Sequence, residues 1–75
     1  MNELDVVVLN RDMKESGLIK GDIGTVVHVY DSGKSVEVEF VAPEGKTIAV
    51  LTLPIKDVRP MKRNEILHTR GFSAV

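Results

Sequence analysis

The sequence predicts an all-β fold, a small antiparallel barrel of five short strands. The first observation is a pair of segments rich in β-branched and aromatic residues, 23–30 and 35–41, separated by a tight turn that contains Gly33. A strand, a short glycine turn and a second strand are typical of a β-hairpin. The second observation is that five such segments follow one another at short spacing, with no long helical pattern between them. This spacing favours a barrel over a layered α/β fold.

Each predicted element has a local reason. Runs of Val, Ile and Leu define the strands, and clusters of Pro, Gly and Asp separate them. A long polar connection, residues 10–21, follows the first strand, and loops of that length are often functional. Pro54 opens a short helical turn before the last strand, which Pro60 ends. The predicted strands are residues 5–9, 23–30, 35–41, 47–53 and 58–59.

The two hairpin turns predict the register of the three central strands. When the turns are centred on Ser32-Gly33 and Glu44-Gly45, both hairpins place the same residues on one face, and a one-residue slip would invert every side chain. A bulge near Gly24 would shift part of the second strand. The expected core face consists of Val27, Val29, Val36, Val38, Phe40, Ala49, Leu51 and Leu53, and the residues expected to complete the core are Leu4, Val6, Val8, Ile55 and Val58.

The opposite face of this sheet carries a row of aliphatic side chains, with His28 expected beside Glu37. Contiguous apolar patches on a surface often mark a contact with a partner, whereas scattered surface valines need no explanation. Three interpretations stay open: a partner or a second copy covers the patch, the tail covers it with Ile66, Leu67 and Phe72, or the valines have no function. The candidate interface consists of Val26, Glu39, Val41, Ile48 and Val50.

The length allows one barrel domain, residues 1–60, followed by a basic tail, residues 61–75, that is either disordered or packed on the barrel. Residues 1–58 carry six Lys and Arg against ten Asp and Glu, a net charge of −4. Residues 59–75 carry four against one, a net charge of +3. An acidic body opposes nucleic-acid binding, which depends on neutralising phosphates. We therefore expect a protein partner and no nucleic-acid partner, with the tail suited to an acidic partner or to self-association.

The expected compartment is the cytoplasm. The chain has no cysteine, which excludes disulfides and thiolate metal sites. No apolar run reaches membrane-spanning length, and the first residues lack the basic and apolar regions of a secretory signal. We expect no membrane association.

No arrangement of residues predicts a catalytic or cofactor site. The serines lie mostly in turns or in the tail, so no serine is expected beside a histidine base. His28 beside Glu37 is better explained as a surface His–carboxylate pair than as an acid–base pair. A zinc site needs three or four converging ligands, and the glycines follow neither the P-loop nor the dinucleotide-binding pattern. We expect no enzyme activity, no catalytic residue, no metal and no cofactor.

A series of segments matches a known family pattern. They are ELDVVVL at residues 3–9, Gly17-Leu18, GDIGTVV at 21–27, VEVEF at 36–40, and Leu53-Pro54 followed by DVRP at 57–60. On these segments the chain resembles the bacterial domain-of-unknown-function family 4926 over about residues 2–60. The resemblance implies a five-stranded SH3-like barrel, here with a short C-terminal tail from Met61 outside the pattern, and it brings no catalytic residues. Some members of that family lie near toxin-like or effector-like genes, and the resemblance therefore implies an antitoxin-like or immunity-like role.

A looser resemblance is to the translation-associated KOW element, and it rests on Gly21, Gly24, Val26 and Val29. It implies an SH3-like barrel that contacts RNA or protein. The chain departs from such binders because its body is acidic and because stacking on bases needs exposed aromatic side chains beside cations.

Two functions from different classes remain. The first is a non-enzymatic protein-interaction module of bacterial type, an antitoxin-like or regulatory partner of another protein. The second is a self-associating structural or accessory domain, and a weak KOW-like nucleic-acid binder is a further alternative. The expected partner is therefore another protein or a second copy of the chain.

Overall fold

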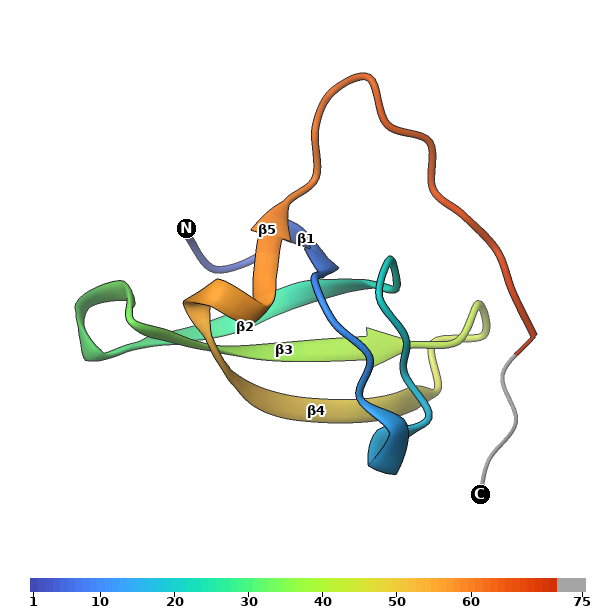
Figure 1. Cartoon of the computed structure of the whole chain (residues 1–75), viewed down its shortest axis with the longest axis horizontal. Coiled ribbons are helices and arrows are strands. Elements are labelled where there is room, and N and C mark those ends of the chain that lie inside the picture. The colour runs from blue at the N-terminus through green and yellow to red at the C-terminus, as the bar shows by residue number, and fades with distance from the viewer. Residues whose placement is uncertain (72–75) are drawn as a thin grey trace.

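A computed structural model describes residues 1–71 of the chain and shows an all-β domain (Figure 1). Its five strands form one antiparallel sheet in the order β4-β3-β2-β1-β5, which confirms the predicted five-stranded all-β fold. Within the described residues no helix is long and apolar enough to cross a membrane. The strands are β1 (Val6–Leu9), β2 (Ile23–Tyr30), β3 (Ser35–Val41), β4 (Thr47–Pro54) and β5 (Val58–Pro60), and the short 3₁₀ turns are η1 (Lys14–Ser16), η2 (Asp31–Gly33) and η3 (Ile55–Asp57).

Strand β2 joins the two halves of the sheet. Its first residues pair with β1, its later residues pair with β3, and Thr25 pairs with both Val6 and Glu39. Gly24 lies at this crossing, where the backbone of β2 lies against β3 too closely for a side chain. A glycine is therefore required at this position.

The hairpin registers are confirmed on both sides of β3. Val29 lies opposite Val36, and Phe40 lies opposite Ala49, as the turn positions predict. The bulge in β2, however, lies between Val26 and His28 rather than near Gly24. Because the bulge adds one residue to β2, the side chains before it change faces. Val26, and not Val27, therefore lies opposite Val38.

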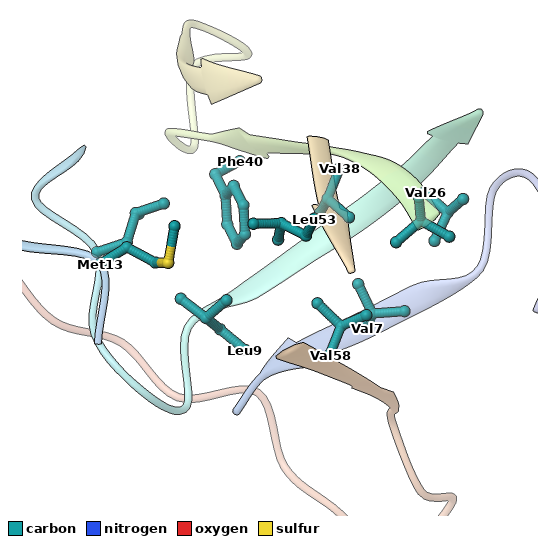
Figure 2. Close-up of a cluster of buried hydrophobic side chains, with 10 residues drawn as sticks. Val7, Leu9, Met13, Val26, Val38, Phe40, Leu53 and Val58 are labelled. Carbon is teal, nitrogen blue, oxygen red and sulfur yellow. The ribbon is translucent and has the colours of Figure 1, made fainter. Parts of the chain in front are cut away.

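The core is a cluster of side chains from every strand and from the loop after β1, and Figure 2 shows them converging. The expected core positions on β3, together with Leu53 of β4 and Val58 of β5, are confirmed. Four other expected residues are half-buried against the cluster: Val29, Ala49, Leu51 and Ile55. Val27 lies at the bulge, half-buried and outside the cluster. The cluster consists of Val7, Leu9, Met13, Leu18, Val26, Val36, Val38, Phe40, Leu53 and Val58.

Two of the expected core positions in and before β1 are wrong. Leu4 and Val6 are exposed, and Val7 and Leu9 are buried instead. The run Val6–Leu9 is apolar throughout, so no alternation of polar and apolar residues indicates which side chains point inward. Val8 is also buried, but it lies outside the core cluster.

The connection 10–21 is not a purely polar loop. Met13 and Leu18 pair across a small antiparallel bridge and insert their side chains into the core. Gly17 turns the chain between them with φ +71°, a left-handed conformation that favours glycine. The loop is also held to η3, since the amide of Asn10 donates to the carbonyl of Asp57 and Arg11 Nε donates to the Asp57 carboxylate, each within 2.9 Å.

After β5 the chain continues as a strap without regular structure. In Figure 1 it arcs away from the sheet and returns on the side of the β3–β4 turn. Arg59 and Glu65 form a two-bond ion pair at 2.6 and 2.7 Å near its beginning. Arg70, near the end of the described chain, bonds to Asp22. The expected tail contact of Phe72 lies outside the described residues.

Candidate interaction site

The predicted interface residues do not all share one surface. Val26 is 0% exposed and belongs to the core, because the bulge after it turns its side chain inward. Ile48 is half-buried against the core, because a second bulge pairs Phe40 with Ala49 and Val41 with Thr47 and leaves Ile48 between them.

Three of the predicted residues do face solvent together. Val41 is 51% exposed and Val50 is 48% exposed. Glu39 of β3 lies opposite Val50 of β4 and accepts a hydrogen bond from Thr47 Oγ1 at 2.8 Å. The exposed apolar surface is therefore smaller than the sequence predicts, and it lies over β4 and the end of β3.

Strand β4 is an edge strand of the sheet, since among the described residues only β3 pairs with it. Among the backbone hydrogen bonds of turns and loops in residues 1–71, none involves Thr47–Pro54. The strand is eight residues long and has no charged side chain. Edge strands of monomeric proteins are usually protected by charges, bulges or short length. Apart from the bulge at Ile48 and Pro54 at its end, β4 has none of these protections.

A groove of about 640 Å³ opens beside the β3–β4 turn. The body of the domain contributes its apolar floor, and the strap forms one side. Leu67 is 62% exposed even though it lines this groove, so the strap covers the groove only in part. The lining residues from the body include Leu18, Asp22, Ile23, Phe40, Val41 and Ile48, and those from the strap are Leu67, His68, Thr69 and Arg70.

Asp22 is the polar centre of this groove and is 7% exposed. Arg70 donates from Nε to Oδ1 at 2.7 Å and from Nη2 to Oδ2 at 2.5 Å, so its guanidinium forms a bidentate contact with both carboxylate oxygens. The Ile19 amide donates to Oδ2 at 2.9 Å, and His68 Nε2 lies 3.4 Å from Oδ1. Arg70 Nη2 also donates to the Gly17 carbonyl at 2.9 Å.

The surroundings of Asp22 determine its charge. Burial by itself would raise the pKa of the carboxyl, but the hydrogen bonds from Arg70 and the Ile19 amide, together with the charges of Arg70 and His68, hold the pKa below 3.8. Asp22 is therefore a carboxylate at neutral pH, and its charge is matched by a cation from the strap.

The predicted pair of His28 and Glu37 is in register but does not interact. His28 Nδ1 lies 3.5 Å from Glu3 Oε2, and its ring packs edge-on against Tyr30 at 4.4 Å between centroids. Glu37 accepts the Tyr30 hydroxyl at 2.7 Å, and this hydrogen bond raises the pKa of Tyr30. The histidine and the carboxylate have separate partners, so the expected surface pair of His28 with Glu37 is wrong.

The cations of β5 and the strap are partly neutralised inside the molecule. The Arg59 guanidinium and the Lys62 amide hold the pKa of Glu65 at about 2, so the Arg59–Glu65 pair stays charged at neutral pH. Arg70 is paired with Asp22. Among residues 1–71 no three His, Asp or Glu side chains converge as metal ligands.

The Asp22–Arg70 pair is the feature that sequence reasoning missed. The signals available were an aspartate between two glycines at the start of an apolar strand and a basic tail after an acidic body. Neither signal identifies a partner 48 residues away in the chain.

Comparison with known proteins gives a family and nothing more specific. A family model described as "Domain of unknown function (DUF4926)" matches residues 3–60, from before β1 to the end of β5. No curated protein matches, and no solved structure matches. The match spans most of the chain, so the chain belongs to this family of domains of unknown function.

Proposed function

We propose that this DUF4926 domain is a non-enzymatic protein-interaction module that binds an extended strand of a partner protein along β4. One observation carries the proposal. An eight-residue, uncharged edge strand has no backbone partner on its outer side within the described residues, and exposed valines lie beside it.

The outer edge of β4 presents backbone donors and acceptors that an added strand would satisfy in regular alternation. Such main-chain hydrogen bonds supply affinity, and the side chains beside the edge supply specificity. Val50 and Val41 offer apolar contact, while Glu39 and Thr47 lie beside them as a polar rim. The partner that fits is therefore an uncharged strand with an apolar side chain aligned to Val50.

We propose this role for the bacterial cytoplasm, with the partner regulated or neutralised by the domain in an antitoxin-like manner. The family resemblance supports the role, and the cysteine-free sequence supports the compartment.

A second copy of the chain is the alternative partner. Two β4 strands related by a twofold axis would pair antiparallel, and an uncharged strand brings no like-charge repulsion into that pairing. The domain would then be a self-associating accessory domain.

Light scattering of the purified full chain, together with copurification from the native host, tests the proposal. We expect a copurifying protein that is lost from the Val50→Asp variant while circular dichroism stays unchanged. A doubled mass in light scattering, lost in the same variant, would support the second copy instead. Val6→Asp is the matched control, because Val6 is 42% exposed on β1 and lies away from β4. A monomer with no copurifying protein, or equal loss of association in both variants, would refute the role of β4.

A further inference from the structure

We propose that the groove beside Asp22 is a docking site for an extended peptide segment that carries an arginine, and that strap residues 67–70 are its intramolecular occupant. The groove shares Val41 and Ile48 with the surface near β4, but it does not use the outer backbone edge of that strand. Three observations support this proposal: the two hydrogen bonds from Arg70 to Asp22, the apolar groove beside Asp22, and the fact that the strap covers this groove only in part.

The carboxylate at Asp22 requires a cationic partner. Three groups face it in the described structure: the Arg70 guanidinium, the Ile19 amide and the His68 ring. Arg70 also donates to the Gly17 carbonyl. When the strap leaves, only the Ile19 amide remains as a donor. A carboxylate on an apolar groove floor then lacks its counter-charge, which favours capture of another cation.

The geometry selects a guanidinium over an ammonium. Arg70 places Nε and Nη2 on the two oxygens of one carboxylate, and Nη2 also reaches the Gly17 carbonyl. A planar fork can make these three bonds at once, whereas a lysine ammonium is a point charge that cannot grip both oxygens in this way.

The apolar half of the groove favours a docking segment that also carries an apolar side chain near its arginine. Leu18, Phe40 and Ile48 contribute to its lining, and Leu67 faces the same groove from the strap. Leu67 and Arg70 are three residues apart, about 10 Å in an extended chain. Since Leu67 stays 62% exposed, a segment with a larger apolar side chain at this position would bury more surface than the strap does.

The receptor and its occupant come from different parts of the chain. Gly17, Asp22 and the apolar floor lie inside residues 3–60, which the family model matches, and the occupant lies after them. A tethered segment competes at an effective concentration on the order of millimolar. The strap therefore acts as a competitor that an incoming arginine segment must displace.

Nuclear magnetic resonance titration of the full chain with a synthetic peptide of residues 65–71 tests this. In the Arg70→Ala chain, which leaves the groove without its guanidinium, we expect the amides of residues 17–22 to shift as the peptide binds. We expect the wild-type chain to bind the same peptide at least about fivefold more weakly, because its own strap competes. The Arg63→Ala chain is the matched control, since it removes an exposed arginine from the same strap, and it should behave as wild type.

A peptide in which the arginine is replaced by alanine should not shift these amides, and one with lysine should bind more weakly than the arginine peptide. These peptide variants leave the domain untouched, so they remain informative if a chain variant is unstable. The proposal is overturned if the Arg70→Ala chain shows no shifts at millimolar peptide, if the alanine peptide binds equally well, or if Arg63→Ala gains binding as Arg70→Ala does. None of these results depends on Val50, so they are separable from the test of β4.

Discussion

Gly24 lies against Val38 so closely that a Cβ atom at position 24 would stand 2.5 Å from Val38 Cγ1. The same Cβ would meet the Glu39 carbonyl oxygen and the Phe40 ring, each at 3.0 Å. Two of these neighbours are buried side chains and the third is backbone, so none can move aside easily. The close approach of β2 to β3 at this point therefore depends on the absence of a side chain.

The first prediction is that Gly24→Ala destabilises the domain by about 1–3 kcal/mol, the usual cost of overpacking a core. For a domain of this size each kcal/mol corresponds to about 4–8 °C in melting temperature. Thermal unfolding followed by circular dichroism measures the change. Gly71→Ala is the control, because open space surrounds that position. Equal melting temperatures for Gly24→Ala and wild type would show that the strands are farther apart than described.

The second prediction separates two valines that the sequence assigns to one face. Val26→Asp should unfold the domain at room temperature, because it buries a charge in a small core where total stability is about 5–15 kcal/mol. Val50→Asp should change the free energy of unfolding by no more than about 0.5 kcal/mol, as expected for an exposed position. Chemical denaturation measures both. A folded Val26→Asp protein would contradict the bulge between Val26 and His28.

The parts of the fold that could be predicted are those set by local signals. The glycine turns determine the pairing of β3 with β4 and of the outer part of β2 with β3, and both registers are confirmed. A bulge has no comparable signal, because Val26 and Val27 are equally apolar and either could point inward. One inserted residue is enough to move Val26 from the expected interface into the core.

The candidate site could be predicted only in part, for a different reason. Val41 and Val50 are exposed as predicted, because they follow from the confirmed β3–β4 register. The pairing of Asp22 with Arg70 depends on the path of the strap, which has no periodic pattern in the sequence. The burial of Met13 and Leu18 could not be predicted for a similar reason. Two apolar residues among charged ones do not distinguish a surface loop from a loop that inserts into the core.

The third prediction concerns acid. The pKa of Asp22 lies below 3.8 in the folded state, so its ionised form stabilises the strap contact at any pH above the ordinary range of the carboxyl. That stabilisation is lost as the pH falls through the lowered pKa. We expect the resonances of Arg70 Nε–H and of the Gly17 and Ile19 amides to keep their neutral-pH positions from pH 7 to about 4 and to move below that.

Asp22→Asn is the control for the acid prediction, since it removes the titrating group. It should show the released strap signals already at pH 7, with no further acid transition at these amides. Release of the wild-type strap near pH 6 would contradict the assignment to Asp22.

The last prediction concerns nucleic acid. Four free cations in the tail would give a slope of log K against log[salt] near −3.6 on duplex DNA. Arg59 and Arg70 are held by Glu65 and Asp22, which leaves Lys62 and Arg63 and a slope near −1.8. We expect weak, unselective binding with this shallow slope in fluorescence anisotropy. Glu65→Ala frees Arg59 and should steepen the slope by about 0.9, whereas Glu44→Ala, a removal of an exposed carboxylate in the β3–β4 turn, should leave it unchanged. Submicromolar binding at physiological salt, or a wild-type slope of −3.6, would instead favour the KOW-like function.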